Sequence, residues 1–352
     1  MMKYLSTLRK KFGKHFIFVV FQKPYIVVAE PTSVRRILTD SKTFTKGTDY
    51  TEIFAAAFGQ GLVTSVGERH KKDRGTFAKY FVKSNIAQYM SMMNEKARGA
   101  LDELGDCTGG KVHNVEHFFA LLALRVFMQF ALGYNFLSAL GYEKGREKEE
   151  GFCKAVSDGS WAVGRMITLG LPMWKIFPAV KNIAQSRAEI WEDMQVVVKE
   201  RKEDIANGRA PELEDCLSIM IEENMSDQDM NDHLVTLLSA GHDTTAYFSG
   251  YFAFLLGQHP EIQERLRKEI FDTLAGREDL TADDITEMQY LKKVMQEVLR
   301  LYAIIPSVTR YCTQTTTIKE SGVTIPKGAN ILIPLFLVNR DPEQWENPTG
   351  KS

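Results

Sequence analysis

A carboxylic acid and an alcohol stand side by side in a run of small and polar residues past the middle of the chain. The run is Ala240-Gly241-His242-Asp243-Thr244-Thr245. An acid next to a hydroxyl can move a proton, so Asp243 and Thr244 are candidates for a proton relay. Thr244 is also placed to donate a hydrogen bond to the carbonyl of Ala240, four residues back. We expect the small Ala240 and Gly241 to leave room for a ligand; the alternative is a polar interruption of a core helix.

A second pair of chemically useful side chains lies about fifty residues further on. Glu297 and Arg300 are three residues apart, so they share one face of a helix. In most helices such a pair is a solvent-exposed salt bridge that contributes well under about 1 kcal/mol. The pair alone is therefore a weak indication of function, and it has to be interpreted together with the motifs around it.

The first run lies in the middle of the longest helix that the sequence predicts, over residues 226–258. One helical stripe on it is apolar: Leu234, Leu237, Leu238, Phe248, Phe252, Leu255 and Leu256. At about 1.5 Å per residue the helix would be on the order of 50 Å long. Ser226 and Asp229 are placed as a variant of the capping box at its start. Gly257 is expected to end it, and Pro260 to begin the next helix.

The remaining elements are mostly helices, with strands towards the two ends of the chain. In order, the sequence predicts a β-hairpin over residues 16–28, a helix from Pro31, helices over residues 115–132, 181–207 and 291–302, and strands over residues 315–319, 323–328 and 331–334. The predicted fold class is therefore mainly α with small β-sheets.

The composition is that of a globular protein. Of the 352 residues, 44% are hydrophobic and 25% are charged, and no linker or repeat divides the chain. We therefore expect residues 1–352 to form a single domain. A formal net charge of −1 gives no electrostatic basis for binding nucleic acid.

The four cysteines do not have the spacing of a metal site. Cys107, Cys153, Cys216 and Cys312 lie far apart, and no two of them form a C-x-x-C motif. They are predicted to be reduced and mostly buried thiols, not disulfide partners or zinc ligands. The residue pattern therefore predicts no metal ligand.

The sequence predicts contact with a membrane surface and no membrane span. The longest apolar run near the start, Phe16 to Phe21, is too short to cross a bilayer, and Met1 to Lys14 do not form a signal peptide. Residues 167–180 gather large apolar side chains around two prolines. This segment is a candidate lid that touches a membrane; the alternative is a loop buried under neighbouring helices.

Taken in order, these motifs resemble the cytochrome P-450 superfamily, the heme-thiolate monooxygenases. Residues 240–245 are similar to its oxygen-groove motif. Glu297 and Arg300 are similar to a buried pair that holds the segment before the heme loop. Arg310 matches an arginine that pairs with a heme propionate. Residues 322–328 and 339–345 resemble two further runs of the family, so the resemblance covers nearly the whole chain.

The resemblance implies a heme cofactor, O2 as co-substrate and the insertion of one oxygen atom into an apolar organic substrate. It also implies an NADPH-dependent reductase or another electron donor. The complete protein would lie at the surface of the endoplasmic reticulum membrane.

The site residues that the resemblance implies have four roles. They are Asp243 and Thr244 for proton delivery; Ala240 and Gly241 beside the cofactor; Arg310, Arg74 and His70 for the heme propionates; and Glu297 with Arg300 as a structural pair.

The chain departs from the family pattern at several positions. His70 stands where a tryptophan is usual, ahead of Arg74, and a basic surface helix is the alternative for this segment. Asn339 stands where a histidine is usual. Ala240 stands where one branch of the family has a glutamate esterified to heme, so covalent heme is not expected.

A larger departure concerns the metal ligand. No Cys-bearing glycine loop follows residues 340–342. We therefore expect an incomplete form, trimmed at both ends, in which Glu297 and Arg300 lack the segment that they would brace.

Two other functions are compatible with some of these features. One is a catalytically inactive heme-protein fragment or scaffold that binds lipid or partners. The other is a hydrolase that uses His242, Asp243 and Thr244. Neighbours on a helix point in different directions and no nucleophile elbow is present, so the hydrolase is disfavoured.

Overall fold

Residues 2–20, 23–105, 114–169, 178–209 and 213–350 are described by a computed structural model of the chain. They form two compact units. Unit 1 comprises residues 1–57, 160–183 and 297–352, and unit 2 comprises residues 58–159 and 184–296. The single domain predicted from the sequence stays a prediction.

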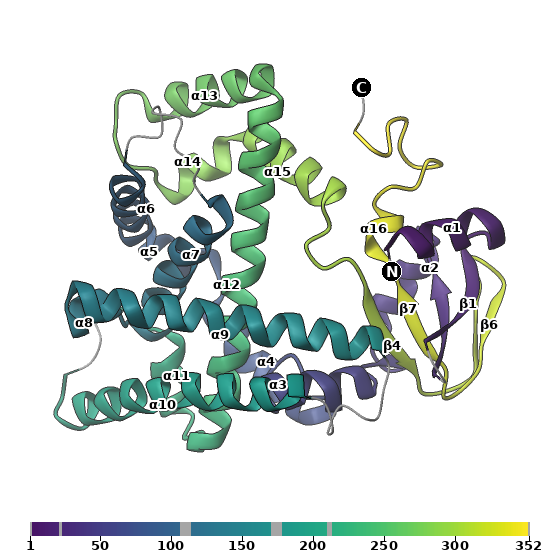
Figure 1. Cartoon of the computed structure of the whole chain (residues 1–352), viewed down its shortest axis with the longest axis horizontal. Helices are drawn as coiled ribbons and strands as arrows, with labels where there is room; N and C mark the ends of the chain where they lie inside the picture. Colours follow the sequence, from purple (N-terminus) through teal and green to yellow (C-terminus); the bar gives the residue numbers. More distant parts are fainter. Residues whose placement is uncertain (1, 21–22, 106–113, 170–177, 210–212, 351–352) are drawn as a thin grey trace. The chain divides into compact units, whose positions relative to one another are not determined.

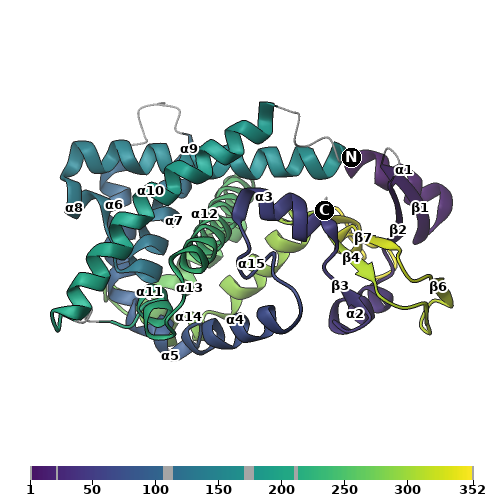
Figure 2. The ribbon, with the colours of Figure 1, turned by 90° about the horizontal axis from the view of Figure 1, so that it is seen from below.

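Unit 1 is built on a sheet whose strands come from both ends of the chain (Figure 1). Its five strands are β1 (His15–Val20), β2 (Lys23–Val28), β3 (Phe44–Thr45), β4 (Val308–Cys312) and β7 (Asn330–Ile333). They are arranged in the order β1-β2-β7-β4-β3. β2 and β7 are parallel, and the other neighbours are antiparallel. Figure 2 shows the early strand β2 beside the late strand β7.

The second sheet is a hairpin of β5 (Thr316–Ile318) and β6 (Val323–Ile325). The helices, in chain order, are α1 (Met2–Phe12), α2 (Pro31–Thr39), the π-helix η1 (Asp49–Phe54), α3 (Ala55–Phe58), α4 (Gly67–Tyr80), α5 (Lys83–Gln88), α6 (Met90–Leu104), α7 (Val115–Leu132), α8 (Phe136–Leu140), α9 (Tyr142–Leu169), α10 (Pro178–Ala206), α11 (Cys216–Glu222), α12 (Asp227–Gln258), α13 (Pro260–Leu274), α14 (Ala282–Glu287), α15 (Gln289–Leu301) and α16 (Leu335–Val338).

The predicted fold, mainly α with small β-sheets, is confirmed, and so is the long helix that carries residues 240–245. The side chain of Ser226 caps α12 by accepting a hydrogen bond from the amide of Asp229. α12 ends at Gln258, as the predicted range of 226–258 does, although His259 and not Gly257 forms its C-cap. α13 begins at Pro260, as predicted.

A buried carboxylate ties the start of the chain to the run after α16. Asp341 is fully buried and forms ion pairs with Arg9 at 2.8 Å and Lys14 at 3.1 Å. Burial alone would raise the pKa of Asp341, but hydrogen bonds from the Glu343 amide and from the two cations outweigh it, and the pKa lies below its usual value. Residues 339–345, singled out in the sequence, are therefore a structural anchor within unit 1.

The core of unit 2 forms where α7 and α12 pack along each other. Leu124, Met128 and Leu132 of α7 are buried, as are Leu234 and Leu238 of α12. By length and composition α7 could also cross a bilayer, which is weak evidence because core helices share these properties. In unit 2 it acts as a core helix, so residues 240–245 of α12 rest on a packed neighbour.

A buried ion-pair network connects α6, α7 and α9. The Arg125 guanidinium donates to both carboxylate oxygens of Glu149 at 2.8–3.0 Å and to Glu103 at 2.8 Å. Glu149 is 1% exposed. Burial would lower the pKa of Arg125, but the hydrogen bonds from Arg125 to the two glutamates raise it above its usual value. The network therefore stays charged, and each member depends on the others.

We expect Arg125→Met to lower the free energy of unfolding by about 3 to 5 kcal/mol, because it leaves the Glu149 charge buried without its partner. Chemical denaturation followed by circular dichroism measures this change. Lys268→Met is the matched control, since the Lys268–Asp272 pair at 2.8 Å is exposed on both sides. Equal effects of the two substitutions would contradict a structural role for the network.

Candidate functional site

Thr244 makes the local bond that its position predicts. Its hydroxyl donates to the carbonyl of Ala240 at 2.6 Å. Ala240 is exposed and Thr244 is half-buried, so both lie on a face of α12 that the described helices leave at least partly open. A hydroxyl on this face is available to a ligand, and its hydrogen bond to the helix fixes its rotamer.

Gly241 faces a different neighbour. A Cβ atom added at this position would overlap the Phe127 ring of α7. The expected room for a ligand is therefore absent beside Gly241, because the aromatic ring fills it. The small residue at 241 serves the close packing of α7 on α12, and only Ala240 remains on the uncovered face.

Asp243 and His242 point into unit 2. Asp243 is 8% exposed, and His242 is fully buried. Their side chains approach to 3.0 Å between Nδ1 of His242 and Oδ1 of Asp243. Asp243 and Thr244 therefore lie on different faces of α12, as the helical rotation of about 100° per residue requires. The same rotation points the side chains of residues 242, 243 and 244 in different directions, whereas a hydrolase would need them close together.

Glu297 and Arg300 form an ion pair at the edge of the core, in which Arg300 is buried and Glu297 is exposed. Arg300 is 7% exposed, and its guanidinium donates to both oxygens of Glu297 at 2.6 and 2.7 Å. It also donates to the carbonyls of Asn339, Asn347 and Pro348 at 3.0–3.3 Å. Arg300 therefore holds residues 339–348 by their backbone, and the expectation that the pair lacks a further segment to brace stays a prediction.

Arg310 lies on β4, where its half-buried guanidinium donates to the carbonyl of Thr309 at 2.8 Å. The Tyr50 hydroxyl interacts with the same guanidinium and with the Thr309 amide. Within the described residues no carboxylate pairs with Arg310. No sequence pattern singles out Tyr50, because its neighbour on β4 is remote along the chain.

Arg74 and His70 lie on α4 in unit 2. Arg74 is exposed and forms no ion pair within the part of the chain that the structure describes, and His70 is half-buried. Lys71 and Lys72 on the same helix are exposed too. The surface of α4 is thus basic, which suits either a propionate-binding position or the solvated helix considered above.

The described cysteines do not present a thiolate. Burial raises the pKa of the Cys153 thiol to about 12, and burial likewise raises the pKa of Cys216 and of Cys312. Cys107 lies outside the described residues, as do residues 170–177 of the candidate lid. Among the residues that are described, no three His, Cys, Asp or Glu side chains gather as metal ligands do.

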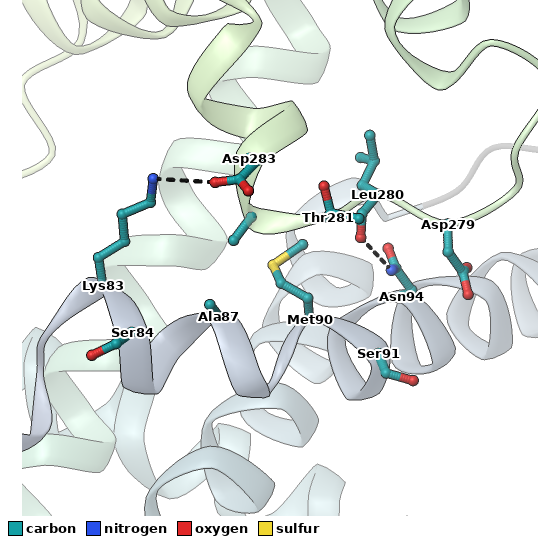
Figure 3. Close-up of a pocket in the computed structure, with 11 residues that line it drawn as sticks. Lys83, Ser84, Ala87, Met90, Ser91, Asn94, Asp279, Leu280, Thr281 and Asp283 are labelled. Atoms are coloured by element: carbon teal, nitrogen blue, oxygen red, sulfur yellow. Dashed lines mark hydrogen bonds and ion pairs between the residues drawn. The ribbon is translucent and has the colours of Figure 1, made fainter.

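A groove of about 600 Å³ in unit 2 lies between α5, α6 and residues 279–283, which lead into the first turn of α14 (Figure 3). Lys83 faces Asp283 at 3.7 Å on one side, and the Asn94 amide donates to the Leu280 carbonyl at 2.9 Å on the other. The lining combines opposite charges with apolar side chains such as Met90. It includes none of the predicted site residues and sets no base beside a nucleophile.

Comparison with known proteins agrees with the resemblance seen in the sequence. The family described as Cytochrome P-450 matches residues 1–350. Cytochrome P-450 4d2 of Drosophila melanogaster is 22% identical over 377 aligned positions, which cover 99% of this chain and 73% of that protein. Cytochrome P-450 4V2 of Homo sapiens is 26% identical over 349 positions, which cover 92% of this chain and 65% of that protein.

A solved structure shares the fold. The structure titled "Retinoic acid bound cyanobacterial CYP120A1" superposes with a TM-score of 0.79 at 24% identity. The match covers 99% of this chain and 75% of that one. The chain thus spans about two thirds to three quarters of the length of these proteins.

The packing at Gly241 yields a test. We expect Gly241→Ala to destabilise the protein by about 1 to 3 kcal/mol, because the methyl group must displace the Phe127 ring. Phe127→Leu combined with Gly241→Ala should recover part of that loss. Thermal and denaturant unfolding of the single and double variants measure both effects.

The control is another glycine of the same helix. A Cβ atom at Gly250 meets nothing within 4 Å, so Gly250→Ala should stabilise α12 by about 0.5 to 1 kcal/mol. If Gly241→Ala behaves like Gly250→Ala, the close contact with Phe127 is not what requires a glycine at position 241.

Proposed function

Because the chain belongs to the cytochrome P-450 family, we propose that the whole protein is a heme-dependent monooxygenase that inserts one oxygen atom from O2 into an apolar organic substrate. The activity is proposed for the whole protein, since the chain spans 65–73% of the two relatives above. The observation that carries the proposal is the Thr244–Ala240 bond on an uncovered face of the long helix.

The side chains present suit the carboxylates of a heme. Arg310 is a half-buried cation without a carboxylate among the described residues, and Arg74 is an exposed one. A guanidinium binds a propionate through two parallel hydrogen bonds, so each arginine would hold one carboxylate. His70 would add a donor next to Arg74. Bound heme supplies the redox chemistry that activates O2.

Thr244 and Asp243 would handle the protons. The Thr244 hydroxyl, held by the Ala240 carbonyl, is positioned on the open face of α12. Asp243 is a buried acid one residue away, from which a proton would reach that face through the neighbouring hydroxyl. Ala240 keeps the face free of bulk beside Thr244, and Glu297 with Arg300 holds residues 339–348 in place.

The proposed partners follow from the same chemistry. Electrons would come from an NADPH-dependent reductase or another donor, and the substrate would be a small apolar molecule. Contact of residues 167–180 with a membrane surface, at the endoplasmic reticulum, completes the proposal.

A heme-binding scaffold without redox activity is the second candidate, and the buried cysteines favour it. Cys153, Cys216 and Cys312 are all buried with raised pKa values, so they are poor thiolate ligands. We therefore expect the 352-residue chain, given heme, reductant and carbon monoxide, to lack the red-shifted Soret band of a thiolate complex. A red-shifted band that disappears in Cys312→Ala would contradict this expectation and identify the ligand.

The proposed monooxygenase activity is tested by the amount of product formed for each O2 molecule consumed. In the heme-loaded whole protein, we expect Thr244→Ala to keep its heme while most of the consumed O2 appears as hydrogen peroxide, because the positioned hydroxyl is lost. Thr245→Ala is the matched control, since Thr245 is an exposed threonine next along the helix. The ratio of product to O2 decides: an unchanged ratio in Thr244→Ala removes Thr244 from the proton relay.

A further inference from the structure

A buried imidazole lies where α4 meets the start of α12. His233 of α12 is 1% exposed, and its ring packs edge to face with the ring of Phe77 of α4, with centroids 5.0 Å apart. Met230 and Leu234 beside it on α12 are fully buried. A polar ring in such a place costs free energy unless its nitrogens find partners. The Nδ1 atom of His233 has no hydrogen-bond partner within the described residues.

The other ring nitrogen faces a buried carboxylate of α4. Nε2 of His233 lies 3.5 Å from Oδ2 of Asp73, a residue that is 7% exposed. The Nε atom of Arg69, one turn earlier on α4, lies 3.7 Å from the same oxygen. Arg69 donates its short hydrogen bond, of 2.6 Å, to Asp229 of α12 instead. Oδ2 of Asp73 is therefore close to two nitrogen-bearing side chains and accepts no hydrogen bond from the described residues.

The charged groups that act on His233 come from both helices. Asp73 and Arg69 face it from α4, and Asp229 and Asp232 lie on α12 within one turn of it. Burial outweighs the attraction of the carboxylates and holds the pKa of His233 below its usual value of 6.5. The imidazole is therefore neutral at neutral pH while α4 is packed on α12.

This shift couples proton binding to the contact between α4 and α12. When the two helices separate, water reaches the imidazole and its pKa returns to about 6.5. Below that pH the open form binds a proton that the closed form does not bind, so the population of the open form rises as the pH falls. The rise is at most about ten-fold for each pH unit, and it ends where the closed form is protonated too.

We propose that His233 and Asp73 form a pH-sensitive latch between α4 and α12, closed at neutral pH and opened by acid. The inference goes beyond the proposed function, because the latch needs no heme. It acts on the helix that carries His70 and Arg74, so its opening also changes where these two candidate binding residues lie.

Hydrogen exchange followed by mass spectrometry measures the opening in the 352-residue chain, once the rates are corrected for the intrinsic effect of pH on exchange. We expect the opening of α4 to increase several-fold, and by at most about ten-fold, between about pH 6.5 and about pH 5.5. α13 of the same unit is the internal reference, and its opening should change less. If α4 and α13 respond equally, the unit opens as a whole and the local latch is overturned.

Three variants identify the group that binds the proton. His233→Gln keeps a polar nitrogen facing Asp73 but does not titrate, so it should remove the effect of acid on α4. His259→Gln is the matched control, because His259 is a half-buried histidine at the end of the same helix, 3.3 Å from Glu261, and the effect should persist. It should also persist in Asp73→Asn. If Asp73→Asn removes the effect and His233→Gln does not, Asp73 is the titrating group and the proposal is wrong.

A second measurement needs no substitution and decides the matter even where a variant does not fold. Slow deuterium exchange at Cε1 of each imidazole, followed by mass spectrometry across a range of pH, gives the pKa of each histidine in the folded protein. We expect the pKa of His233 to lie below 6.5, as its burial requires. A pKa above 6.5 would overturn the latch, because acid would then hold α4 and α12 together.

Discussion

A buried charge must meet an opposite charge or several hydrogen bonds, and this requirement organises both units. In unit 1 the buried guanidinium of Arg300 is satisfied by Glu297 and by three backbone carbonyls from residues 339–348. In unit 2 the guanidinium of Arg125 is shared by Glu149 and Glu103. Loops and helices that share no apolar stripe are thus fixed by the partners that a single cation needs.

Arg310 departs from this pattern in an informative way. Its neighbours are a backbone carbonyl and a phenol, which are neutral groups. A half-buried cation that is solvated by neutral groups keeps most of its attraction for an anion, because no carboxylate of the described chain has already neutralised it. The cation therefore gains most when a ligand brings the carboxylate, and that is the physical argument for placing a propionate beside Arg310.

Elements that depend on contacts between residues close in the sequence could be predicted. Elements that depend on partners far along the chain could not. α12 follows from its apolar stripe and from the Ser226 cap, both of which lie within the helix. α4 was considered only as an alternative, a basic surface helix, because most of its side chains are charged or polar and only a few are buried. The π-helix was not predicted, because Asp49 needs Lys23 and Tyr25 of another strand.

The same distinction holds within the run at residues 240–245. The Thr244–Ala240 bond is a contact between residues one turn apart, so the sequence predicts it. The neighbour of Gly241 is Phe127 on another helix, so the sequence suggests only that something must come close. Ala240 and Thr244 share one face of α12, while Gly241 lies about 100° away from Ala240. Residues 240 and 241 therefore have small side chains for two reasons. At Gly241 the helix must admit an aromatic ring of the core, and at Ala240 it must leave the neighbouring hydroxyl uncovered.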